Sequence, residues 1–163
     1  MPTVKDSLET GAIAPGFRLP SNRGDVALAD YRGKRGVVLY FIREFGCMTC
    51  QFHASTLVKA YPEIQATGFE VLVIGGGSVS DAVKMAARLR APFPILADRE
   101  RTVYEAYNVD KALAFIQRSA TFVVDVDGRV VYAHRSTSPA GGLNVGEVMA
   151  AVRRASSVTG AHD

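Results

Sequence analysis

Residues 37–61 read VVLYFIREFGCMTCQFHASTLVKAY, and the residue pattern changes in the middle of this stretch. The apolar run 37–42 is rich in β-branched and aromatic side chains, which favours a buried strand. Residues 51–61 are typical of a helix, with apolar side chains at helical spacing in Phe52, Leu57, Val58 and Tyr61. The only two cysteines of the chain, Cys47 and Cys50, therefore lie where a strand runs into the N-terminus of a helix.

This position favours a reactive dithiol. The first N–H groups of a helix have no partner within it, and the macrodipole adds positive character there, so a thiolate is stabilised. Cysteine pKa values at such sites fall from about 8.5 to roughly 3.5–7.5. Residues three apart on a helix have Cβ atoms about 5–6 Å apart, so Cys47 and Cys50 can close a disulfide after a modest adjustment. Arg43, just upstream, adds positive charge.

The cysteine pair has two other possible roles, a zinc site and an inert buried pair. Half of a zinc site would need two more ligands, but the chain has no further cysteine and its three histidines show no paired metal-ligand spacing. A buried, inert pair remains open. Redox chemistry is favoured, because the spacing and the strand–helix context both indicate it.

The length of the chain and its net charge limit the number of domains and the kinds of partner that we expect. A chain of 163 residues can bury a sizeable core, and we expect residues 1–163 to form a single domain. The net charge of +3 comes without a basic run, so we expect neither nucleic-acid nor membrane binding. The N-terminus lacks the apolar segment of a signal peptide, and no apolar run approaches the roughly 18 residues of a membrane helix. We therefore expect the cytoplasm, where an adjacent cysteine pair is more often catalytic than structural.

Further strands and helices are expected on both sides of this unit. A small hairpin is predicted in the turn-rich segment 1–36, and a second buried strand over 69–74. The helix after the cysteines is expected to end or kink at Pro62, with Gly68 closing the segment. The remaining predictions are a helix from Ser80 or Asp81 to Arg90 with Val83, Ala86, Ala87 and Leu89 as its apolar positions, a short or edge strand over 92–96, a short helix over 100–107, a hairpin of 121–125 with 129–133, and a final helix over 145–155 before a frayed tail with His162.

Gly75-Gly76-Gly77 follows the second strand and invites comparison with a phosphate-binding loop. The run lacks both the G-x-x-x-x-G-K-[ST] and the G-x-G-x-x-G patterns. We therefore favour a tight turn.

The expected order is β-α-β-α-β-α-β-β-α with one antiparallel hairpin near the end. Strands that alternate with helices predict an α/β fold with a mixed central sheet and helices on both faces.

Several fragments, taken in order, resemble the alkyl hydroperoxide reductase/thiol-specific antioxidant group, the peroxiredoxins and their relatives. The resemblance covers roughly residues 10–155 and implies a thioredoxin-like fold with a short N-terminal hairpin extension. It rests on residues 11–20, 31–34, the strand running into 47–50, 96–98, 104–109 and 121–128.

The usual catalytic pattern of this family is P-x-x-x-[TS]-x-x-C. Counting back from Cys50 places Cys47 at the Thr/Ser position and Arg43 at the Pro position. Residues 43–50, REFGCMTC, instead resemble the R-x-F-x-C-x-x-C of a divergent peroxiredoxin-like branch. That resemblance implies that Cys50 is the peroxidatic cysteine and attacks first, whereas a thioredoxin-style alignment gives the attacking position to Cys47.

A second departure from the family lies before Phe122. Peroxiredoxins usually carry an active-site Arg three residues earlier, and thioredoxin-like disulfide exchangers often carry a cis-Pro nearby. Here these positions hold Ser119, Ala120 and Thr121. Arg118 is one residue off, and strand alternation would turn it to the opposite face unless a bulge intervenes.

Three further residues are candidates for supporting the dithiol. Arg43 could stabilise a developing oxyanion, since a peroxide needs fixed donors. His53 falls three residues after Cys50, where relatives often have an acid, and could share a proton with the thiolate. Thr49, between the cysteines in the predicted helix, could also tune them. The alternatives are a surface Arg and a partly exposed helix histidine.

The resemblance implies a thiol-dependent peroxidase that reduces hydrogen peroxide or organic hydroperoxides through a Cys47/Cys50 dithiol–disulfide cycle. An external dithiol such as a thioredoxin or glutaredoxin would reduce the disulfide, no metal or organic cofactor is implied, and a homodimer is left open. One alternative is a thioredoxin-like protein disulfide oxidoreductase. Another is a non-catalytic redox sensor whose disulfide controls a partner interaction, which apolar patches beside the dithiol would favour.

Overall fold

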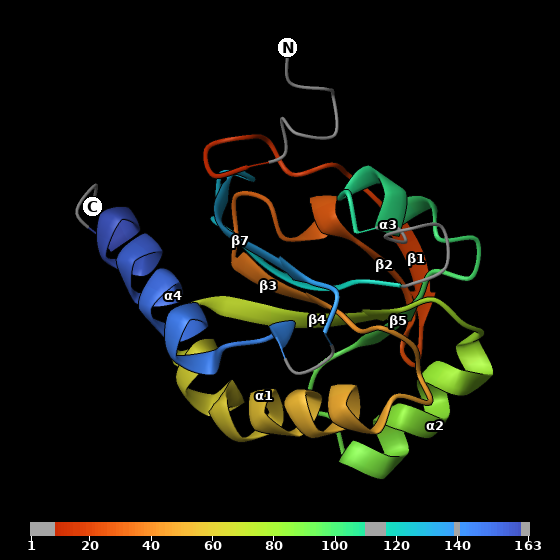
Figure 1. The fold of residues 1–163 in the computed structure, drawn as a ribbon. Helices are drawn as coiled ribbons and strands as arrows, with labels where there is room; N and C mark the ends of the chain where they lie inside the picture. Colours follow the sequence, from red (N-terminus) through yellow and green to blue (C-terminus); the bar gives the residue numbers. More distant parts are fainter. Residues whose placement is uncertain (1–8, 110–116, 139–140, 161–163) are drawn as a thin grey trace.

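The computed structural model describes residues 9–109, 117–138 and 141–160. Seven strands form one sheet in the order β2-β1-β5-β4-β3-β6-β7 (Figure 1). The strands are β1 (Arg18–Ser21), β2 (Gly24–Ala27), β3 (Gly36–Phe41), β4 (Phe69–Gly75), β5 (Ile95–Ala97), β6 (Ser119–Val124) and β7 (Val130–Ser136). The helices are α1 (Met48–Ala66), α2 (Val79–Leu89), α3 (Thr102–Ala106) and α4 (Val145–Gly160), with a 3-10 turn η2 (Leu28–Asp30).

Strand β3 lies inside the sheet and is buried along its whole length. It runs parallel to β4 and antiparallel to β6, so Leu39 pairs with Leu72 on one side and with Phe122 on the other. A strand covered on both faces needs apolar residues in succession rather than in alternation, which is the pattern of residues 37–42. The mixed sheet expected from the sequence is therefore present.

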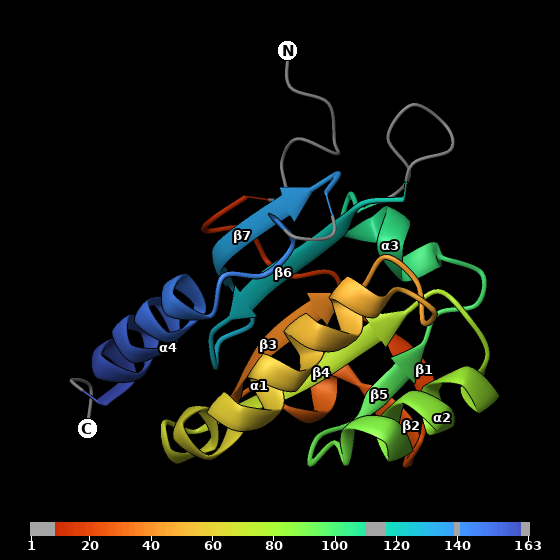
Figure 2. The ribbon, with the colours of Figure 1, turned by 60° about the horizontal axis from the view of Figure 1, so that its bottom comes forward.

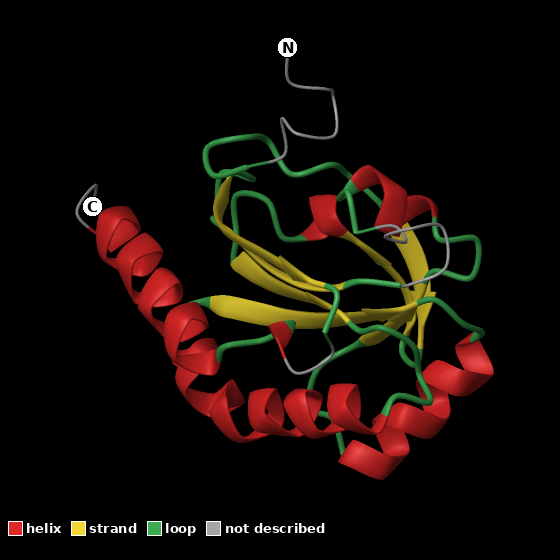
Figure 3. Cartoon of the chain, in the orientation of Figure 1, coloured by secondary structure: helices red, strands yellow, loops and turns green. Residues whose placement is uncertain are grey.

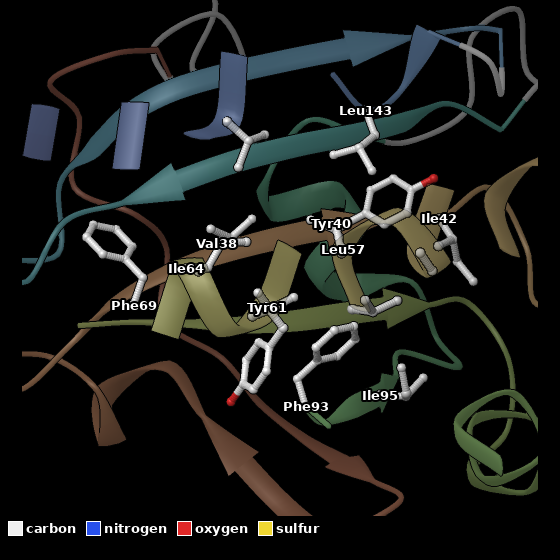
Figure 4. Packing of buried hydrophobic residues seen from close by; sticks show 14 of the residues in the cluster. Val38, Tyr40, Ile42, Leu57, Tyr61, Ile64, Phe69, Phe93, Ile95 and Leu143 are labelled. Atoms are coloured by element: carbon white, nitrogen blue, oxygen red, sulfur yellow. The ribbon is translucent and has the colours of Figure 1, made fainter. Parts of the chain in front are cut away.

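Helices cover both faces of the sheet, as predicted (Figures 2 and 3). Helices α1, α2 and α4 share one apolar layer, which contains Leu57, Met85 and Val148. Helix α3 lies on the opposite face, in a second layer built around Tyr104 and Tyr107. Figure 4 shows side chains of the first layer, where α1 packs against β3 and β4.

Helix α1 is longer than the sequence suggested, because it continues through Pro62 to Ala66. Proline removes one helical hydrogen bond, but Ile64 in the following turn is completely buried, and this packing favours the helical conformation. Gly68 closes the segment as expected, with a positive φ of 88° that suits glycine.

The predicted cap and apolar face of the second helix were partly wrong. Its N-cap is Ser78, whose side chain accepts a hydrogen bond from the Asp81 N–H in a capping box. The buried face consists of Ala82, Met85 and Ala86, whereas Val83 is 47% exposed. Hydrophobic spacing alone therefore assigned the exposed Val83 to the core-facing side of this helix.

Two smaller differences concern β5 and Phe52. Strand β5 is short, as predicted, but pairs with both β1 and β4 and is therefore internal to the sheet. Phe52 points away from the core and is 66% exposed, although its spacing matched the buried face of α1. The tail with His162 lies outside the described residues.

Candidate active site

Cys47 is the N-cap of α1 and has an extended backbone conformation, with φ −74° and ψ 113°. Its Sγ accepts a hydrogen bond of 3.2 Å from the Cys50 N–H. A Ser, Thr, Asp or Asn oxygen usually makes this capping contact. The sulfur of Cys47 therefore satisfies an unpaired helix N–H while its residue stays partly exposed to solvent.

Cys50 occupies the first turn of the same helix but is completely buried. Its Sγ accepts a hydrogen bond of 3.3 Å from the main-chain N–H of Arg43. Burial, followed by a hydrogen bond with Cys47, raises the pKa of Cys50 to about 11. The general expectation of a lowered pKa at a helix N-terminus is therefore wrong for Cys50, since desolvation outweighs the helix end.

The loop between β3 and α1 is held in place by Gln51, which the sequence analysis did not single out. Its buried side-chain amide donates to the Phe45 carbonyl at 2.9 Å. Its carbonyl oxygen accepts at 3.0 Å from the Arg88 guanidinium on α2. The only sequence signal was a polar residue directly after the C-x-x-C, at a position that the helix buries.

The glycines at the end of β4 and directly after it accommodate the Phe45 ring. A Cβ on Gly75 would lie 2.4 Å from Phe45 Cζ, and one on Gly77 would lie 2.7 Å from Phe45 Cδ2. A Cβ on Gly76 would lie 2.4 Å from Arg101 Cζ. None of the three has the positive φ of a left-handed turn. The chain bends at Gly76 and Gly77, as the predicted turn requires, and the triple glycine also permits a close approach of the active-site loop, a packing role that was not predicted.

Tyr104 holds together the C-terminal ends of β3 and β4, where the active-site loop begins. Its hydroxyl lies 2.6 Å from the carbonyl of Ile42 and 3.0 Å from the carbonyl of Ile74. Tyr104 itself is completely buried. This contact joins α3 to the ends of β3 and β4 across the sheet. It was not predicted, because the partners lie far apart in the sequence.

The three residues predicted to support the dithiol differ in their contacts with the cysteines and in their exposure to solvent. Arg43 contacts Cys50 through its main chain, and its guanidinium forms no hydrogen bond with either sulfur in the described part of the chain. Thr49 is exposed on the first turn of α1. His53 is partly buried one turn after Cys50, and its ring meets Phe52 edge-on at 5.9 Å between centroids.

The residues before Phe122 also behave as strand alternation predicts. Arg118 turns to the α3 face of the sheet, where its guanidinium donates to the Asn108 carbonyl. Ser119 is buried on the face that carries Cys50, and the described residues contain no cis peptide bond. Neither an active-site Arg nor a cis-Pro is thus present at the position where relatives have one.

Among the hollows on the described surface are one beside the active-site loop and one at the opposite end of β3. The smaller, about 160 Å³, lies beside the active-site loop between Phe45, Gly46 and the α2 residues Lys84 and Arg88. The larger, about 210 Å³, includes Val37 and Val124 and is therefore at the end of β3 remote from the cysteines. Of these two, the smaller hollow is the one that adjoins the loop leading to Cys47.

Within the described ranges, no group of three or more His, Cys, Asp and Glu side chains is arranged to hold a metal ion. None of the described helices is long and apolar enough to cross a membrane.

Comparison with known proteins identifies the family. The model of the AhpC/TSA family matches residues 10–133. The thiol-disulfide oxidoreductase ResA of Geobacillus kaustophilus is 35% identical over 130 residues, which cover 78% of this chain and 70% of that protein. Alkyl hydroperoxide reductase E of Mycobacterium bovis is 33% identical over 129 residues, covering 77% and 84% respectively. The crystal structure of the peroxidoxin BcpB of Mycobacterium tuberculosis superposes with a TM-score of 0.80 at 24% identity, covering 90% of this chain and 97% of that one. The chain therefore belongs to the AhpC/TSA family and has its thioredoxin-like fold.

Proposed function

We propose that this protein is a thiol-dependent peroxidase that reduces hydrogen peroxide or organic hydroperoxides through a Cys47/Cys50 cycle. The observation that carries the proposal is the pair of free thiols in one helical turn, with Cys47 partly exposed and Cys50 buried behind it. The match to the AhpC/TSA family supports the same reaction class.

The cycle needs only the two sulfurs and an external reductant. A thiolate attacks the O–O bond, so an S–O bond forms, the O–O bond breaks, and the leaving oxygen takes a proton as water or an alcohol. The second cysteine then attacks the sulfenic acid, which forms the disulfide and releases water. An external dithiol, such as a thioredoxin or glutaredoxin, reduces the disulfide and is itself oxidised.

The geometry favours Cys47 as the first nucleophile, in contrast to the sequence-based expectation of Cys50. Cys47 is partly exposed at the helix N-terminus, whereas Cys50 is buried and its raised pKa keeps it protonated near neutral pH. Single variants decide the order. If Cys47 attacks first, Cys50→Ser should consume one peroxide equivalent and leave a trappable sulfenic acid on Cys47, and Cys47→Ser should lose rapid consumption. The reverse result would restore Cys50 as the peroxidatic residue.

The decisive experiment compares two oxidants on the reduced wild-type protein. We expect hydrogen peroxide or an organic hydroperoxide to remove thiols faster than a small disulfide does at the same concentration. Slow loss with peroxides and rapid loss with the disulfide would contradict the peroxidase proposal.

A thiol–disulfide oxidoreductase is the second candidate. The exposed first cysteine and the buried second one favour it, and ResA is 35% identical to the chain. The absence of an Arg at the Ser119 position removes one donor that a peroxidase would use, but the absence of a cis-Pro there equally weakens disulfide exchange. The comparison of oxidants above separates the two reactions.

A redox sensor is the third candidate, because apolar side chains surround the dithiol. Met48 is 76% exposed and Phe52 66% exposed, both within the first two turns of α1. Such side chains suit a protein partner that responds to the disulfide. Slow thiol loss with both oxidants, together with a partner that binds only one redox form, would favour this candidate over an enzyme.

We propose a single-domain protein of the cytoplasm, where thioredoxin-type reductants operate. A homodimer is compatible with this proposal, and sedimentation at micromolar concentration would test it.

A further inference from the structure

Tyr40 carries a hydroxyl that the fold has not otherwise used. The residue lies in β3 and is completely buried. In the part of the chain that the structure describes, its hydroxyl has no hydrogen-bond partner. A buried hydroxyl without a partner costs free energy, so its retention at such a place calls for a physical reason.

The hydroxyl lies beside Cys50. Tyr40 and Cys50 belong to the same apolar layer between the sheet and α1. Figure 4 shows the Tyr40 ring below Leu143, with its oxygen on the side toward Ile42, the residue at which the chain leaves β3 for the active-site loop. Burial, and after it the charge and hydrogen-bonding capacity of Cys50, raise the pKa of Tyr40 far above its usual value. The phenol therefore keeps its proton throughout the physiological range and can act only as a donor toward a thiolate.

We propose that the Tyr40 hydroxyl donates a hydrogen bond to Cys50 Sγ when this sulfur becomes a thiolate, and that Tyr40 is thereby a catalytic residue of the dithiol cycle. A buried thiolate needs donors, because it has lost its water. The main-chain N–H of Arg43 supplies one at 3.3 Å, and the Tyr40 hydroxyl supplies another. The reduced protein holds a neutral Cys50 thiol, which is only a weak acceptor, so the contact with the hydroxyl becomes a strong hydrogen bond when the charge forms.

The proposal rests on the dithiol role of Cys47 and Cys50 but not on peroxide as the substrate. In either order of attack Cys50 must act as a thiolate, as the first nucleophile or as the one that closes the disulfide. The titratable groups that act on Tyr40 are Cys50 and Cys47 at the start of α1 and Tyr104 from α3. A hydrogen bond to a thiolate lowers the pKa of the thiol, so removal of the phenol oxygen should raise it.

The test uses dithiobis(nitrobenzoate), an aromatic disulfide that releases one coloured thiolate when the first cysteine attacks it and a second when the other cysteine closes the disulfide. Cys47→Ser and Cys50→Ser assign the two phases. In Tyr40→Phe we expect the phase that Cys50 supplies to slow about tenfold, since hydrogen bonds to charged groups are the stronger ones. The phase that Cys47 supplies should keep its rate.

Tyr107→Phe is the matched control. Tyr107 is also a buried tyrosine, but it lies in the layer on the opposite face and its hydroxyl donates to the Pro15 carbonyl at 2.6 Å. We expect this variant to leave both phases unchanged even if it lowers the melting temperature. In Tyr40→Phe the pH midpoint of the slowed phase should rise by about one unit, a shift that a loss of packing would not produce.

A second measurement covers the case in which the variants differ in stability. In the Cys47→Ser background, the pH dependence of the alkylation rate with iodoacetamide reports Cys50 alone, and Tyr40→Phe should move its midpoint to higher pH. An unchanged midpoint, or equal slowing in Tyr40→Phe and Tyr107→Phe, would overturn the proposal. Because no peroxide is used, inertness toward peroxide would contradict the proposed function while leaving this result valid.

Discussion

At the scale of single residues, the two cysteines differ sharply although they share one turn of helix. Cys47 replaces an oxygen-bearing cap residue and is partly exposed, whereas Cys50 faces the core and meets the main-chain N–H of Arg43. Where the family pattern has a proline, which carries no N–H, this chain has a residue that can donate to the Cys50 sulfur. Position within a turn thus decides which sulfur is accessible and which is shielded.

The burial of Cys50 predicts a specific pH dependence of stability. Burial raises its pKa from 9.0 to about 11, so the folded protein holds this proton where the unfolded chain loses it. The contribution of the neutral thiol is complete below about pH 9 and is lost as the pH rises through about 11. We expect the free energy of unfolding of the reduced protein, measured with urea, to fall over this interval. Cys50→Ser should show a smaller fall, and equal falls in the two proteins would contradict the assignment.

Arg43 gives a second prediction at this scale. Its main-chain donor survives substitution, so Arg43→Met removes only the guanidinium. A positive charge near a thiol favours its thiolate form. We therefore expect the variant to raise the pH midpoint of thiol alkylation by between a few tenths of a pH unit and about one unit. Lys59→Met removes an exposed charge more than two turns along α1 and is the control. An unchanged midpoint in Arg43→Met would show that only the main chain of Arg43 matters.

At the scale of elements, the strand–loop–helix unit depends on contacts from the rest of the sheet. Phe45 packs on the glycines at the end of β4 and just after it, and Gln51 ties the loop to its own helix and to α2. Tyr104 reaches the same strand ends from α3. The loop that presents Cys47 is therefore held from three directions.

A glycine variant tests this arrangement. In Gly75→Ala the new methyl group would overlap the Phe45 ring, whose Cζ lies 2.4 Å from the built Cβ position. We expect a stability loss of about 1–3 kcal/mol and altered alkylation rates at both cysteines, because the displaced ring moves the loop. Gly16→Ala, with no atom within 4 Å of its built Cβ, is the control for a harmless methyl group. Normal stability in Gly75→Ala would mean that the Phe45 ring is free to move.

The sequence predicted the elements of this site better than its contacts. The run of β-branched residues in β3 and the helical spacing in α1 are local signals, and they were confirmed. Gln51, Tyr40 and Tyr104 were missed because their importance comes from partners on other elements; Tyr104 and Ile42 are 62 residues apart in sequence. Phe52 and Val83 were misplaced because hydrophobic spacing cannot separate a core face from an exposed apolar surface.

At the scale of the whole molecule, the chemistry is concentrated at one end of a rigid sheet. Strands β3 and β4 run parallel, so the active-site loop after β3 and the glycines after β4 meet at the same edge (Figure 1). The cysteines lie within one turn of a 19-residue helix that is anchored along its length by buried side chains. Closing a disulfide inside this turn demands no movement between distant elements.

This architecture predicts a reversible intramolecular disulfide that leaves the fold intact. Mild peroxide or a small disulfide should remove two hydrogens from the mass of the monomer, and dithiothreitol should restore them, because each molecule closes its own Cys47–Cys50 bond. The far-ultraviolet circular dichroism should stay the same, since both sulfurs belong to the cap and first turn of α1. The single variants Cys47→Ser and Cys50→Ser lack the internal partner and are the controls; they should form sulfenic acids or intermolecular dimers instead. Persistent free thiols in the wild-type protein, or dimers as its only oxidised product, would show that the two sulfurs do not meet within one chain.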